Sequence, residues 1–130
     1  MKKTVAIISS DPISINYEIL KKSLHFFKKK NKNKYIIIGS KKIFNLKIKN
    51  VEQIDINWNG KKNKSQYLKK CFEKFFFLYK TKKVHALINL PLNKKEFLKN
   101  SFPGVTEYIS NKFNCLGNET MLLYSNKFSV

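Results

Sequence analysis

The chain has 130 residues, of which 42% are hydrophobic and 14% are aromatic. This length is typical of one domain, and the composition is too apolar for a disordered or fibrous protein. The formal net charge is +19, from 27 basic and 8 acidic residues.

All 27 basic residues are lysines, and they are scattered along the whole chain. Arginine normally leads the recognition of bases and phosphates, so its absence argues against a nucleic-acid site. Lys, Asn, Ile, Phe and Tyr have A/T-rich codons, and genome base composition therefore explains the bias without any partner. A basic module that binds RNA, DNA or an acidic surface stays the alternative.

No apolar run approaches the ~20 residues of a membrane span, so we expect no membrane contact. The first residues have neither the long apolar stretch nor the small-residue cleavage site of a signal peptide, which favours a cytoplasmic location. Cys71 and Cys115 are too few for a disulfide framework or a cysteine zinc site. Both lie among apolar residues, and we expect buried free thiols.

Apolar runs alternate with helical patterns, which predicts an α/β fold with a mostly parallel sheet in a single domain over residues 1–130. Ser14 is expected to cap the first helix, with Glu18 in its first turn, and Ser65 is expected to cap the second long helix. The pattern of residues 40–50 is ambiguous, and a short helix is the interpretation that we take for it. We expect strands at residues 4–9, 35–38, 51–56, 85–90 and 119–124, and helices at 15–29, 65–80, 93–99 and 105–112.

Ligands of an open α/β sheet bind at the loops that follow the carboxyl ends of the strands. These loops are expected at residues 9–16, 39–42, 90–95 and 101–107. The sequence has only four glycines, and none forms a dinucleotide-binding or phosphate-loop motif.

Three groups of residues together resemble a known family. The first group is the opening Thr4-Val5-Ala6-Ile7, followed by Asp11-Pro12 and Glu18. The second group comprises residues 84–94, which read VHALINLPLNK, and residues 102–107, which read FPGVTE. The third group comprises Met121-Leu122-Leu123 and Phe128-Ser129-Val130. In this order they resemble the 4-hydroxythreonine-4-phosphate dehydrogenase family of vitamin B6 biosynthesis. The resemblance is moderately specific at both ends and weak between residues 41 and 64.

The resemblance implies a three-layer fold like that of isocitrate and isopropylmalate dehydrogenases, of which this chain is a first-domain portion. The family oxidises a small phosphorylated substrate with NAD and a divalent metal such as zinc, held by three histidines, and its members form dimers. The chain thus resembles a truncated or divergent dehydrogenase that is inactive alone. Its partner would be a second chain completing the enzyme, or a second copy in a homodimer.

Candidate substrate-binding residues follow from the family motif. Thr106 matches a threonine that contacts substrate, although it could equally be an ordinary first-turn helix residue. Val105 stands at a histidine position of the family and can neither donate nor titrate. Lys94 could meet a phosphate, or be one more solvated lysine. Glu107 could orient Thr106, or only complement the helix dipole.

We assign no catalytic residue and no metal ligand in this chain. His25 and His85 are the only histidines, and two cannot reproduce a three-histidine site. Asp11 fits a turn better than catalysis. In the opening loop, four residues stand where the family has Gly, Gly, Gly and Pro; they are Ser10, Ser14, Asn16 and Tyr17. Retained apolar faces with lost polar residues would also fit a folded remnant or a subunit-interaction piece that has no chemistry.

Overall fold

The computed structural model describes residues 2–30, 32–60, 63–115, 117, 118, 120 and 122. The chain forms two compact units, Met1–Phe97 and Leu98–Val130, which are described separately below. Whether the 130 residues fold as one domain stays a prediction. Within the described part of the chain, no helix is both long enough and apolar enough to cross a bilayer.

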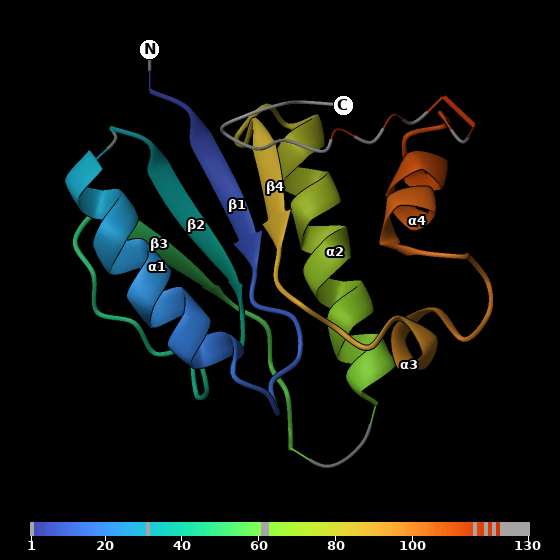
Figure 1. Ribbon diagram of the computed structural model, residues 1–130, viewed down its shortest axis with the longest axis horizontal. Coiled ribbons are helices and arrows are strands. Elements are labelled where there is room, and N and C mark those ends of the chain that lie inside the picture. Colours follow the sequence, from blue (N-terminus) through green and yellow to red (C-terminus); the bar gives the residue numbers. More distant parts are fainter. Residues whose placement is uncertain are drawn as a thin grey trace. The chain divides into compact units, whose positions relative to one another are not determined.

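The first unit contains a four-stranded sheet in the order β3-β2-β1-β4 (Figure 1). The strands are β1 (Thr4–Ile8), β2 (Lys34–Gly39), β3 (Val51–Asp55) and β4 (Ala86–Asn89). Every neighbouring pair is parallel. The four carboxyl ends therefore lie at one edge of the sheet and the four amino ends at the other. The expected α/β fold with a parallel sheet is confirmed.

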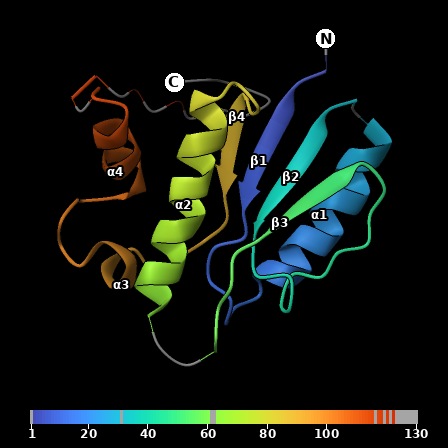
Figure 2. The same ribbon diagram turned by 180° about the vertical axis from the view of Figure 1, so that it is seen from behind.

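Two long helices cover opposite faces of this sheet, which makes three layers (Figures 1 and 2). They are α1 (Asn16–Lys30) and α2 (Lys64–Lys80). Leu20 and Leu24 of α1 form one core cluster with alternate strand residues such as Ile7 and Ile37. Because strand side chains alternate between the two faces, the intervening residues point to α2. Strands buried on both faces read as continuous apolar runs, which is why β1 and β2 were recognisable in the sequence.

Buried aromatic and aliphatic side chains of α2 form the second core. They are Tyr67, Leu68, Cys71, Phe72, Phe75, Phe76 and Leu78. The ring of Phe72 stacks on Phe97 of α3 (Lys94–Leu98) at a centroid distance of 5.2 Å. This contact attaches α3, which follows β4 in the chain, to α2.

The second unit contains α4 (Val105–Lys112), which confirms the helix expected at these residues. Tyr108 and Ser110 are its buried residues. The ring of Phe102 meets Tyr108 edge-on at 5.7 Å, so the segment before the helix packs against it.

Some local expectations were wrong. Residues 40–50 form turns and extended loop rather than a helix, and Ile43 and Phe44 both donate their backbone N–H to the carbonyl of Ser40. Ser65 does not cap α2, because the helix begins one residue earlier and the Ser65 hydroxyl donates to the carbonyl of Phe97 at 3.0 Å. Cys115 is only half-buried, whereas Cys71 is fully buried as expected. The strand expected at 119–124 and the element expected at 128–130 lie largely or wholly outside the described residues.

Candidate functional site

The loops that follow β1 and β4 meet at the carboxyl edge of the sheet. The N–H of Leu90 donates to the carbonyl of Ile8 at 3.0 Å. The side-chain amide of Asn16 donates to the carbonyls of Ser9 at 3.0 Å and Pro91 at 2.8 Å. Asn16 is 1% exposed and so connects the two loops from the inside. The expected loops 9–16 and 90–95 are therefore brought together.

The loop after β2 joins the same edge. The N–H and the hydroxyl of Ser9 both donate to the carbonyl of Ile38, at 3.1 and 3.2 Å. The N–H of Ser40 donates to the Tyr67 hydroxyl of α2 at 2.7 Å. Three of the four loops expected at ligand-binding positions thus form one hydrogen-bonded cluster in the first unit.

One buried acceptor in this cluster has no partner. The side-chain Oδ1 of Asn16 is fully buried and receives no hydrogen bond from the described residues. A buried polar atom without a partner costs free energy, so the site favours a small donor such as a water molecule, a hydroxyl or an ammonium group. Asn16 is also the first residue of α1, and its own N–H donates to the Ser14 hydroxyl at 3.1 Å.

A lysine lies between two carboxylates beside this cluster. The ammonium of Lys64 is 3.4 Å from Asp11 and 3.6 Å from Glu96. Asp11 also accepts a hydrogen bond from the N–H of Ile13 at 2.9 Å, which confirms its role in the turn. Partly exposed ion pairs contribute little stability, so their main effect here is to position the start of α2 beside the loop after β1.

The cluster contains a tyrosine and a cysteine, but no activated nucleophile among the described residues. Burial raises the pKa of the Cys71 thiol to about 12, so Cys71 is a neutral thiol at physiological pH. Burial likewise raises the pKa of Tyr67, which keeps its hydroxyl protonated. Ser9 and Tyr67 are already hydrogen-bonded inside the cluster, and the Oδ1 of Asn16 is its acceptor without a partner among the described residues.

The four candidate substrate-binding residues fall in both units. Lys94 is the first residue of α3 and is exposed at the end of the loop after β4. In the second unit, Val105 is half-buried and Thr106 is exposed in the first turn of α4. Glu107 is half-buried, and one of its carboxylate oxygens lies 2.9 Å from where a Cβ on Gly104 would stand. Their contact with a substrate stays a prediction.

The described residues do not fit the three-histidine metal site of the family. Among them, no three His, Cys, Asp or Glu side chains gather closely enough to hold a metal ion. His25 is an exposed residue of α1, and the Nδ1 of His85 accepts the N–H of Thr4 at 3.1 Å. Any resident metal would need ligands from elsewhere.

Sequence reasoning missed Asn16, Tyr67 and Lys64 as residues that build this edge. Asn16 stood out only as a replacement for a family glycine, and Tyr67 fitted the apolar face of its helix. The signal that could have found them is a polar group at a position where the helical pattern demands burial, because such a group needs an internal partner.

Comparisons with known proteins agree with this architecture. No protein-family model matches the sequence, and no curated protein matches it. The structure is similar to a 4-hydroxythreonine-4-phosphate dehydrogenase from Burkholderia phymatum, with a TM-score of 0.74 and 15% identity, over 99% of this chain and 48% of that one. A chain from Salmonella typhimurium, described as a candidate for the same enzyme, gives a TM-score of 0.68 and 19% identity, over 98% and 50%. The chain therefore spans about half of each solved chain, and the likeness shows the fold that the sequence resemblance implied.

Proposed function

We propose that this chain is the first half of a 4-hydroxythreonine-4-phosphate dehydrogenase-like protein, in truncated or divergent form. By resemblance, the complete protein would be an NAD-dependent oxidoreductase of vitamin B6 biosynthesis. The observation that carries the proposal is the structural likeness over 99% of this chain to about half of the Burkholderia phymatum enzyme. The order of the sequence motifs at residues 4–18 and 84–107 supports it independently.

The chain alone does not supply the chemistry of a metal-dependent oxidation. Its two histidines cannot make a three-histidine site, and Val105 has no polar atom for a substrate. We therefore propose that a further polypeptide segment, on a second chain or continuing this one, supplies the metal ligands. By resemblance to the family motif, Thr106 of the second unit would hydrogen-bond the substrate and Glu107 would orient Thr106. By the same resemblance, Lys94 of the first unit would attract a phosphate as a point charge.

An activity assay tests the first part of this proposal. The purified chain is mixed with 4-phosphohydroxythreonine, NAD and zinc ions, and NADH formation is followed by absorbance. We expect no rate above the protein-free control. Robust turnover by the chain alone would show that it contains a complete active site, and would overturn the proposal that it needs another segment.

The coding sequence beyond the codon of Val130 tests the second part. We expect the same reading frame, or an adjacent one, to encode three histidines and basic substrate-binding residues within the remainder of this fold. If that segment is found, the two halves are assayed together. If no such segment is encoded there or elsewhere in the same genome, the dehydrogenase proposal is wrong and a binding or vestigial protein remains.

A further inference from the structure

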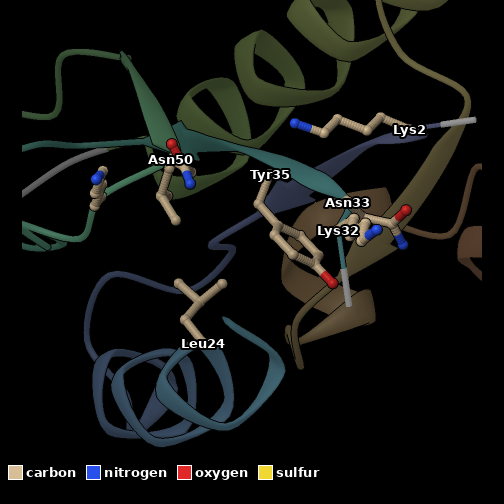
Figure 3. Close-up of a pocket in the computed structure, with 8 residues that line it drawn as sticks. Lys2, Leu24, Lys32, Asn33, Tyr35 and Asn50 are labelled. Carbon is tan, nitrogen blue, oxygen red and sulfur yellow. The ribbon is translucent and has the colours of Figure 1, made fainter. Parts of the chain in front are cut away.

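A cavity of about 480 Å³ lies at the amino edge of the sheet, opposite the edge described above (Figure 3). This volume is within the range of sites that hold small molecules, roughly 300–1,000 Å³. Residues just before three adjacent strands form its rim, and residues of α1, β2 and β3 form its wall. The lining residues are Lys2, Leu24, Lys32, Asn33, Tyr35, Lys49, Asn50 and Val51.

One wall of the cavity is apolar and aromatic. Leu24 of α1 and Tyr35 of β2 belong to the same buried core cluster, and Val51 packs against that cluster. Figure 3 shows the ring of Tyr35 extending from its strand on the side of Leu24. Since these side chains are held by the core, the wall is preformed. Leu24 and Tyr35 are 2% and 7% exposed, so the wall presents a narrow apolar edge to a ligand.

The rim of the cavity is cationic. Lys2, Lys32 and Lys49 are exposed and precede β1, β2 and β3 respectively. None of the lining residues is acidic. A cleft lined by one sign of charge beside an apolar wall concentrates the electrostatic field and attracts an anion. Lysine ammonium groups bind phosphate as compact point charges.

Backbone contacts fix the segments that carry these lysines. The N–H of Lys34 donates to the carbonyl of Lys3 at 2.9 Å, and the N–H of Lys3 donates to the side chain of Asn33 at 3.4 Å. The N–H of Val51 donates to the carbonyl of Ile48 at 3.3 Å. The backbone beside the three lysines is therefore tied to the strand starts.

We propose that this cavity binds a small organic phosphate the size of a nucleoside monophosphate. Its planar part would lie against Tyr35 and Leu24, and its phosphate would face Lys32 and Lys49. The exposed Asn50 would provide a hydrogen bond beside the body of the ligand. The site shares no residue with the carboxyl edge, so it does not depend on the dehydrogenase proposal.

The test is isothermal titration of the full chain with adenosine 5′-monophosphate, with adenosine and inorganic phosphate as separate arms. We expect saturable binding of the monophosphate, about tenfold or more tighter than either part alone, because charge and apolar wall both contribute. The variant Lys32→Glu/Lys49→Glu should weaken binding of the monophosphate by at least about tenfold.

The control Lys69→Glu/Lys83→Glu changes the net charge equally at exposed positions that do not line the cavity. It should leave the affinity within about twofold, because exposed charges that do not line the cavity are screened by solvent and salt.

Both pairs alter exposed side chains, so we expect normal folding, checked by circular dichroism. If the glutamate pair unfolds, Lys32→Gln/Lys49→Gln removes the charges without reversing them. Absence of saturable binding at millimolar monophosphate would overturn the proposal. So would equal affinity for inorganic phosphate, equal affinity for adenosine, or an equal loss in the Lys69/Lys83 control, which would mark non-specific attraction to the basic chain.

Discussion

Polar side chains lie in opposite environments at the two edges of the parallel sheet. At the carboxyl edge, Ser9, Ser10, Asn16 and Ser40 are at most 2% exposed and are held by backbone or internal hydrogen bonds. At the amino edge, lysines around a cavity are exposed to solvent. The polar side chains at the first edge therefore contribute to stability through internal hydrogen bonds, whereas the exposed lysines at the second edge contribute little to it. Substitutions should therefore change stability at one edge and binding at the other.

The largest expected effect at the carboxyl edge comes from Gly39→Ala. A Cβ at this position would lie 1.9 Å from the Ser9 hydroxyl and 3.1 Å from the Tyr67 hydroxyl. Ser9 is fully buried, so its side chain cannot move out into solvent. We expect a loss of about 3 kcal/mol in the free energy of unfolding, measured by urea denaturation.

The variant Ser9→Gly/Gly39→Ala is the control for this clash. Removing the Ser9 side chain makes room, so the double variant should be less destabilised than the sum of the two single variants. At the amino edge, Lys2→Ala should change stability by less than about 0.5 kcal/mol. If Gly39→Ala were as mild as Lys2→Ala, the close approach of β2 to Ser9 would be wrong.

The sheet and its long helices were predictable because their signals are local. Continuous apolar runs indicated β1 and β2, and helical spacing of apolar residues indicated α2. The loops were harder, because their structure depends on partners far away in the sequence. Ser65 has the composition of a helix cap, yet its hydroxyl bonds to Phe97, 32 residues later. No local sequence pattern distinguishes a serine that caps a helix from one that bonds a distant carbonyl.

The candidate site was predictable only in outline. Parallel strands place successive loops at one edge, which located Ser9–Asn16 beside Leu90–Lys95 without any structure. The bridge from Asn16 to Pro91 spans 75 residues and could not be read from either segment. The amino-edge cavity was missed for a related reason. With 27 lysines spread along the chain, nothing in the sequence marks Lys2, Lys32 and Lys49 as neighbours.

The next largest effect should come from Asn16→Ala. The variant loses the amide that bonds the carbonyls of Ser9 and Pro91, and it leaves the Ser9 carbonyl short of a donor in a buried place. We expect a loss of about 2 kcal/mol in the free energy of unfolding, measured by urea denaturation.

Asn93→Ala makes the same substitution at an exposed site. The Asn93 side chain accepts one hydrogen bond, from the N–H of Glu96 at 3.2 Å, at the start of a short helix. Loss of this bond should lower the free energy of unfolding by at most about half of the amount expected for Asn16→Ala, since solvent can replace the bond. Equal effects at the two positions would contradict the bridging role of Asn16.

The smallest effect separates two substitutions of Ser10, which stands at a glycine position of the resembled family. Ser10 is buried in a left-handed conformation with φ of 60°, and its hydroxyl donates to the carbonyl of Ile8 at 3.3 Å. Ser10→Gly loses that bond but also removes the steric cost of the conformation, whereas Ser10→Ala loses the bond and keeps the cost. The glycine variant should thus be more stable than the alanine variant by about 1 kcal/mol.

At Ser23, within α1, the order should reverse by a similar amount, about 1 kcal/mol, because alanine favours a helix and glycine does not. A more stable alanine variant at both positions would mean that Ser10 does not have the left-handed backbone that glycine favours.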